Sequence, residues 1–113
     1  MSRKNALTAS PPMPVAAAIK GLGTRLRAAR LARNLTIEEV GRRIGTGPRA
    51  VSDAEAGKPG VGANVIVALL WVYDLLEPFH QLADPATDAI AQSHLRVRER
   101  ARRGRSGELD YDF

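Results

Sequence analysis

Apolar residues recur at helical spacing in the first third of the chain. Leu22, Leu26 and Ala29 fall at positions i, i+4 and i+7, which places them on one face of a helix. This pattern predicts a helix over Gly23–Arg33. Asn34, a residue type that tolerates the left-handed conformation of helix ends, follows directly and marks its end.

Two short helices are predicted on either side of a glycine-rich turn. Thr36 and Glu39 have the spacing of a capping box, and they predict a helix over Thr36–Ile44 that Gly45 ends. A second helix is expected over Pro48–Ala56, because proline has the fixed backbone angle of a first helical position. Only three residues separate the two helices, which favours the steep crossing of a helix-turn-helix unit.

The second half of the chain contains patterns for three more helices and a strand. Ala63–Tyr73 is apolar on nearly all sides, which predicts a buried central helix. Leu76–Ala83 has a short inward face, made of Leu76, Phe79 and Ala83. Asp84 precedes a proline, as at a helix start, and the helix is expected to reach about Arg103. Glu108–Phe113 alternates polar and apolar residues, which predicts a short β-strand.

These patterns divide an all-α chain into three parts. Residues 1–15 lack periodicity, contain three prolines and are expected to form a flexible basic arm. Residues 16–83 form the helix-turn-helix domain, and residues 84–113 form an arginine-rich helix and an acidic-aromatic strand for contact with a second copy or a partner. The open alternatives for Arg96–Arg105 are DNA flanks, the chain's own acidic tail, an acidic groove on a partner, or solvent. The length suffices for one modest core. No apolar run reaches the ~20 residues of a bilayer span, so we expect a cytoplasmic protein without membrane contact.

The distribution of charge favours a polyanion as partner. The net charge is +5, from 17 basic and 12 acidic residues. Residues 1–60 hold 11 basic and 4 acidic side chains, and residues 96–105 hold 6 and 1. A small protein with its positive charge concentrated in this way most often binds nucleic acid, although a merely soluble surface is the alternative.

The sequence gives little support for catalysis, metal binding or disulfide formation. The chain has no cysteine, which excludes disulfides, thiolate catalysis and cysteine zinc sites. Two isolated histidines, His80 and His94, make a poor metal site. Ser52 has no neighbouring histidine to activate it. We therefore expect no metal, no cofactor and no enzymatic activity.

The run Leu22–Gly57 resembles the lambda-repressor/Cro-like helix-turn-helix regulators, the XRE family. The resemblance rests on the capping box, the turn glycine and the spacing of Val51, Glu55 and Gly57, and it continues through residues 60–82. It implies a five-helix DNA-binding domain, here followed by an extra helix and a short terminal strand. The implied partner is double-stranded DNA.

The resemblance also implies which residues meet the DNA. The helix that begins at Pro48 would enter the major groove and read bases. Arg49 fits the O6 and N7 acceptors of guanine, with a phosphate clamp as the alternative. Asp53 either accepts a hydrogen bond from cytosine or braces Arg49 four residues earlier. The base-contacting set is Pro48, Arg49, Ser52 and Asp53.

Phosphate contacts are expected around the turn and at the amino end of the Ile37 helix, where backbone N–H groups are free. Two positions depart from the family pattern. Ile37 replaces a common glutamine and serves either the core or a contact with a sugar or thymine methyl. Gly47 lacks the common hydroxyl and offers only its backbone N–H. The phosphate-binding set is Ile37, Arg42, Arg43, Thr46, Gly47 and Lys58.

Scaffold and partner contacts complete the expectations. The resemblance places Arg30 opposite Glu55 as a structural ion pair. Tight binding takes two half-sites, so a homodimer on a palindromic operator is expected. For Trp71, plain core burial is the alternative to a dimer contact. The candidates for contact with a second copy or partner are Trp71, Tyr73, Leu75, Phe79, Leu109, Tyr111 and Phe113.

The acidic-aromatic end Leu109–Phe113, behind an arginine-rich helix, resembles the antitoxins paired with HipA-type toxin kinases. The sequence therefore indicates a repressor of its own operon and, more sharply, an antitoxin with a HipA-like kinase as partner. An interaction module with weak or lost DNA binding is the alternative.

Overall fold

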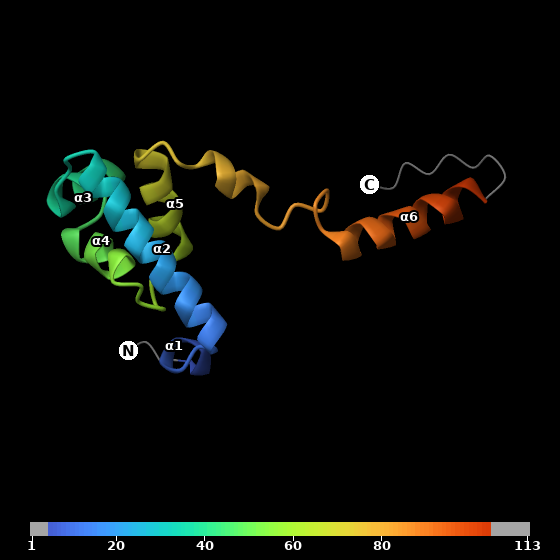
Figure 1. The fold of residues 1–113 in the computed structure, drawn as a ribbon, viewed down its shortest axis with the longest axis horizontal. Helices are drawn as coiled ribbons and strands as arrows, with labels where there is room; N and C mark the ends of the chain where they lie inside the picture. The colour runs from blue at the N-terminus through green and yellow to red at the C-terminus, as the bar shows by residue number, and fades with distance from the viewer. Residues whose placement is uncertain (1–4, 105–113) are drawn as a thin grey trace. The chain divides into compact units, whose positions relative to one another are not determined.

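The computed structural model describes residues 5–104, and the chain divides into two compact units, residues 1–79 and residues 80–113. The described part is helical and contains no strand, which confirms the all-α class. The strand predicted within Glu108–Phe113, with Leu109, Tyr111 and Phe113, lies outside the described residues. The helices are α1 (Ala6–Ala9), α2 (Met13–Ala32), α3 (Ile37–Ile44), α4 (Pro48–Glu55), α5 (Ala63–Val72), the 3-10 helix η1 (Glu77–Gln81) and α6 (Ala89–Arg103) (Figure 1).

The first unit is built around α2, which begins earlier than predicted. It starts at Met13 rather than Gly23, and α1 precedes it with Asn5 as its N-cap. The prediction of a flexible arm over residues 1–15 is therefore wrong for these segments. Pro14 stands in the first turn of α2, where its missing N–H leaves no hydrogen bond unmade, and alanines with high helix propensity follow.

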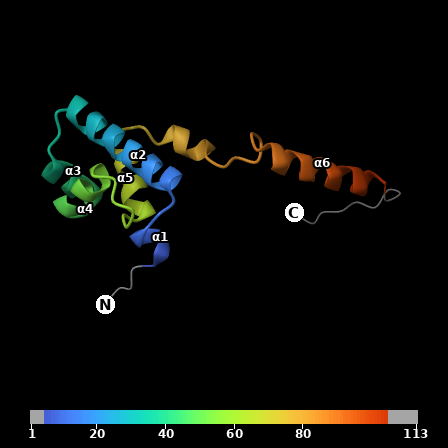
Figure 2. The same cartoon turned by 60° about the horizontal axis from the view of Figure 1, so that its bottom comes forward.

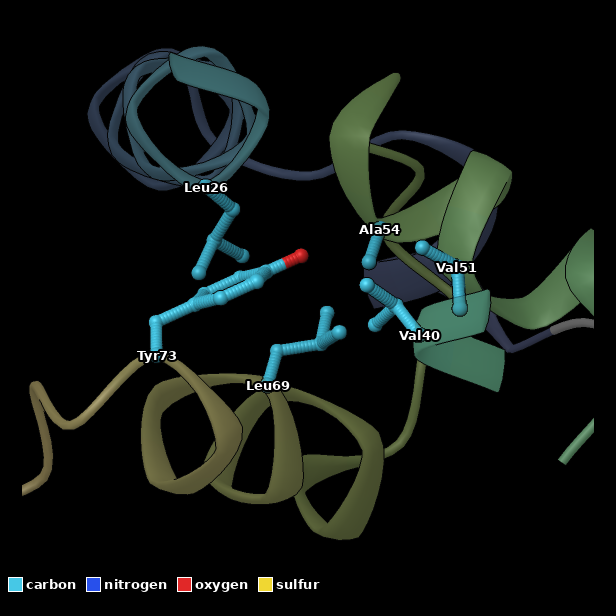
Figure 3. Packing of buried hydrophobic residues seen from close by; sticks show 6 residues of the cluster. All are labelled: Leu26, Val40, Val51, Ala54, Leu69 and Tyr73. Carbon is cyan, nitrogen blue, oxygen red and sulfur yellow. The ribbon is translucent and has the colours of Figure 1, made fainter. Parts of the chain in front are cut away.

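Helices α2 to α5 enclose one core. Helix α2 packs against α4, α3 packs against α4 and α5, and α4 also contacts α5. Figure 2 shows the same grouping from a second direction. The ring of Tyr73 lies between Leu26 and Leu69, with its hydroxyl on the side of Ala54 (Figure 3). The buried side chains are Leu26, Val40, Val51, Ala54, Leu69 and Tyr73.

Glycines allow α2 to approach the end of α4 at backbone distance. A Cβ added to Gly23 would lie 2.6 Å from the carbonyl oxygens of both Ala54 and Glu55. A Cβ on Gly57 would lie 2.7 Å from the Cα of Lys20, and the φ of Gly57 is +71°. Only glycine fits such contacts, so both positions fix the place of α4 against α2.

Two further predicted helices, over residues 63–73 and 76–83, differ from the structure. Helix α5 matches its predicted position, but only Leu69 within it is fully buried. Most of its other residues are half-buried, and Trp71 is 61% exposed. The helix predicted over Leu76–Ala83 is the short 3-10 helix η1. Its predicted inward residue Phe79 is 37% exposed. The apolar composition of these two segments predicted that both are buried, but Trp71 and Phe79 are exposed in the structure.

In the second unit, α6 begins later than predicted. Asp84 does not cap a helix, since its Oδ1 accepts from the backbone N–H of Ala86 in a turn. The N-cap is Asp88, whose Oδ1 accepts from Ile90 and Ala91. Between residues 5 and 104, no helix is long and apolar enough to cross a membrane.

Candidate nucleic-acid interface

The turn between α3 and α4 is held closely against α3. Gly45 ends α3 with φ +80°, and the N–H of Thr46 donates to the carbonyl oxygen of Gly41 at 2.8 Å. A Cβ on Gly41 would lie 2.9 Å from the carbonyl oxygen of Thr46. Gly41 was not among the predicted residues, although a glycine inside a helical pattern signals close backbone approach. The turn therefore packs directly on α3 and sets the direction in which α4 begins.

Helix α4 has one face in the core and one face in solvent. Val51 and Ala54 are buried. Pro48, Arg49 and Ser52 are exposed, and the side chain of Arg49 is 87% exposed. Three of the four predicted base-contacting residues therefore share the solvent face of a helix whose opposite face packs in the core.

Asp53, the fourth of these residues, is engaged by two cations. Its Oδ1 lies 2.9 Å from the Nζ of Lys58, and its Oδ2 lies 4.0 Å from the Nε of Arg49. The helical spacing predicted Arg49 as a partner but not Lys58. The sequence signal for the contact with Lys58 was Gly57, because its left-handed conformation turns the chain so that Lys58 lies beside α4. Asp53 therefore offsets positive charge beside the exposed face.

Arg30 and Glu55 come together as a buried pair behind α4. The Nε of Arg30 donates to Oε2 of Glu55 at 2.7 Å, and its Nη2 donates to Oε1 at 3.0 Å. The hydrogen bond to Glu55 raises the pKa of Arg30, which keeps the guanidinium charged. The pair connects α2 with the last residue of α4.

The predicted phosphate-binding residues differ in their surroundings. Arg42, Arg43 and Lys58 are exposed, and Thr46 is half-buried. Gly47, the N-cap of α4, is exposed, and a Cβ there would meet nothing within 4 Å. Ile37 packs against the core, the first of its two predicted roles.

The amino end of α3 is less open to an anion than predicted. The N–H of Glu39 already donates to the hydroxyl of Thr36, and the N–H of Thr36 donates to the carboxylate of Glu39, each at 3.1 Å. The hydrogen bond from the Thr36 backbone lowers the pKa of Glu39. With Glu38 in the same turn, this end of the helix carries two carboxylates that repel phosphate.

The candidate dimer residues separate into core and surface. Tyr73 is 1% exposed, so its predicted place on a dimer surface is wrong. Burial raises its pKa, and the Cζ of Arg33 lies 5.7 Å from the centre of its ring. Trp71 is exposed, which contradicts plain core burial, and Leu75 and Phe79 are also exposed.

Comparison with known proteins supports the helix-turn-helix interpretation. A family model described as a helix-turn-helix domain matches residues 21–78, just over half of the chain. No curated protein and no solved structure gives a significant match. The matched range contains α3, the turn, α4 and α5. The chain therefore belongs to the helix-turn-helix domain family, a membership that supports DNA binding as its activity.

Proposed function

We propose that this protein is a sequence-specific transcriptional repressor that binds double-stranded DNA in the cytoplasm. The solvent face of α4, which carries Pro48, Arg49 and Ser52, is the observation that supports the proposal. In this proposal α4 lies in the major groove, and Arg49 donates two hydrogen bonds to a guanine. The exposed Arg42 and Arg43 bind phosphates and fix the position of α4.

The repressor acts as a homodimer on a palindromic operator of XRE type. Helix α4 has eight residues and spans only a few base pairs. Two copies with their reading helices about 34 Å apart bind two half-sites and give the required affinity. The exposed Trp71 is the proposed contact between copies, because aromatic side chains are enriched in such interfaces.

A binding titration tests the base-reading role of α4. The probes are duplex DNA from upstream of the coding sequence and a scrambled duplex of equal length. Arg49→Ala removes a bidentate pair worth about 1–3 kcal/mol, so affinity for the upstream duplex falls about 5- to 150-fold. Arg27→Ala removes the same charge from the exposed side of α2 and is the matched control. Equal preference for the two duplexes in wild type and Arg49→Ala would contradict the proposal.

We further propose that the protein is the antitoxin of a HipA-type kinase. The support is the acidic-aromatic sequence Leu109–Phe113, which lies outside the described residues. A neighbouring reading frame for such a kinase, and co-purification that removal of residues 109–113 abolishes, would support it. Co-purification that persists after residues 109–113 are removed would refute it.

An interaction module with weak DNA binding is the second candidate. Asp53 favours it, because its carboxylate neutralises Lys58 and faces the same side as Arg49. The same titration separates the two candidates. Binding that is absent even at low salt supports the module, and binding that weakens steeply with salt supports the repressor.

A further inference from the structure

Helix α6 carries a dense set of arginines that the proposed function of α4 does not use. Its last eight residues contain five arginines and one acidic residue, Glu99, which pairs with Arg103 at 3.6 Å. The helix is exposed from Ser93 onward. Such a concentration of positive charge requires an anionic partner or solvent on every side.

The arginines of α6 lie on opposite sides of the helix. At about 100° per residue, Arg96 and Arg100 are about 40° apart, while Arg98 lies about 160° from both. A flat anionic surface reaches only one side of a helix. A helix in the major groove has the phosphates of one strand on each side. The two-sided placement of charge therefore fits a duplex better than a membrane or a shallow acidic groove.

The apolar side chains of α6 are too few and too scattered for another kind of partner. Ile90, Val97 and Ala101 share one face, and Ile90 and Val97 are 72% and 62% exposed, but His94 interrupts this face. Leu95 lies about 160° away from Val97. Lipid binding and helix-in-groove binding both need a continuous apolar stripe. A second copy of α6 would bring arginine against arginine.

We propose that α6 is a second duplex contact, which binds phosphates of both strands without reading bases. The proposal rests on the proposed function only in sharing DNA as the ligand, and it uses no residue of α4. The structure places α6 in a separate unit, so the two contacts can be disabled independently. Binding by α6 adds affinity for any duplex sequence.

The salt dependence of binding by the full-length protein tests the proposal. The probe is a scrambled duplex, and the variant is Arg98→Gln with Arg100→Gln, which keeps helix propensity and removes two charges. The plot of log K against log salt has a negative slope, and each lost phosphate contact makes it less steep by about 0.9. The steepness is therefore expected to decrease by about 1.8. The matched control, Arg98→Lys with Arg100→Lys, keeps the charge and retains the wild-type slope. Far-UV circular dichroism verifies that both variants remain helical.

The outcomes distinguish this proposal from the proposed function. A reduced slope in the glutamine variant, together with no loss of affinity for the upstream duplex in Arg49→Ala, supports the contact by α6 and counts against base reading by α4. An unchanged slope in the glutamine variant overturns the contact by α6 whatever Arg49→Ala does. Tighter binding of wild type to phosphatidylserine vesicles than to the duplex also overturns it, in favour of a membrane surface.

Discussion

Arg30 and Glu55 form a two-pronged ion pair that joins α2 to the end of α4. The side chains are only 9% and 6% exposed. A third donor of the guanidinium, Nη1, holds the carbonyl oxygen of Leu35 at 2.9 Å, one residue before the capping box of α3. The side chain of Arg30 therefore connects α2, the end of α4 and the segment that leads into α3. It helps to determine the orientation of the exposed face of α4.

Glu55→Ala is expected to destabilise the protein by about 3–5 kcal/mol, because it leaves the charge of Arg30 buried without its partner. Urea denaturation followed by circular dichroism measures the loss. Arg30→Met combined with Glu55→Leu removes both charges, and it is expected to recover much of that stability. A cost below about 1 kcal/mol for Glu55→Ala would show that the pair does not hold α4 in place.

Gly23→Ala is expected to destabilise the protein by about 1–3 kcal/mol, although alanine favours helices. The added Cβ would meet two carbonyl oxygens of α4 at 2.6 Å, and backbone atoms cannot move aside as a side chain can. Gly21→Ala is the matched control in the same helix, where the Cβ would meet only the flexible end of Arg25 at 3.2 Å. It is expected to be neutral or stabilising by up to about 1 kcal/mol. Equal thermal denaturation midpoints for the two variants would contradict the close packing of α2 on α4.

Local rules were sufficient to predict the part of the fold that presents the site. The capping box at Thr36 and the helix end at Gly45, where φ is +80°, determine α3 from a few neighbouring residues, and the sequence predicted both the capping box and the end of the helix. Pro48 likewise marked the start of α4. The exposed position of Arg49 then followed from the burial of Val51 two residues later.

Features that depend on distant residues could not be predicted in this way. The role of Gly23 depends on α4, which lies about thirty residues later in the chain, and no local pattern specifies that contact. The pairing of Asp53 with Lys58 depends on the left-handed turn at Gly57. Trp71 shows the same limit, since an apolar helix predicts burial without specifying whether this small domain has enough neighbours to cover it.

Tyr73→Phe is expected to leave stability unchanged or to raise it by about 1 kcal/mol. The hydroxyl of Tyr73 is buried and has no hydrogen-bond partner among residues 5–104, so its removal relieves a desolvation cost without loss of packing. Thermal denaturation at neutral pH measures the effect. Destabilisation by more than about 1 kcal/mol would indicate a bound water as partner of the hydroxyl.

The same substitution alters the alkaline limb of the stability curve. Burial, and then the negative charge of Glu55, raise the pKa of Tyr73 above its ordinary value of 10.0. The protonated phenol therefore favours the folded state. Its contribution is complete below pH 10 and is lost as the pH rises through the higher folded-state pKa. Wild type is expected to lose more stability above pH 10 than Tyr73→Phe, and identical alkaline limbs would contradict this.

Acid is expected to weaken the capping box of α3. Hydrogen bonds from the backbone and hydroxyl of Thr36 hold the pKa of Glu39 below its ordinary value of 4.5. Its contribution to stability is present above pH 4.5 and is lost as the pH falls through the lowered folded-state pKa. Glu39→Gln keeps an oxygen that accepts from Thr36 but does not titrate. Urea denaturation between pH 3 and 7 should show a smaller acid loss for this variant, and an equal loss would place the acid sensitivity elsewhere.

Asp53→Asn distinguishes the two roles that a carboxylate can have on α4. If Asp53 mainly restrains cations, the substitution releases Lys58, which lies 2.9 Å away, and leaves Arg49 without its weaker partner at 4.0 Å. Affinity for a scrambled duplex then rises, and the salt slope increases by about one phosphate contact, or roughly 0.9. If Asp53 instead accepts from a cytosine, asparagine keeps one acceptor oxygen but also gains an amide donor that suits adenine, so discrimination at that base pair of the upstream duplex relaxes by up to about 1–3 kcal/mol. Because the ion pair with Lys58 is short and that with Arg49 is long, we expect the first result. An unchanged slope together with relaxed discrimination at one base pair would assign Asp53 to base reading.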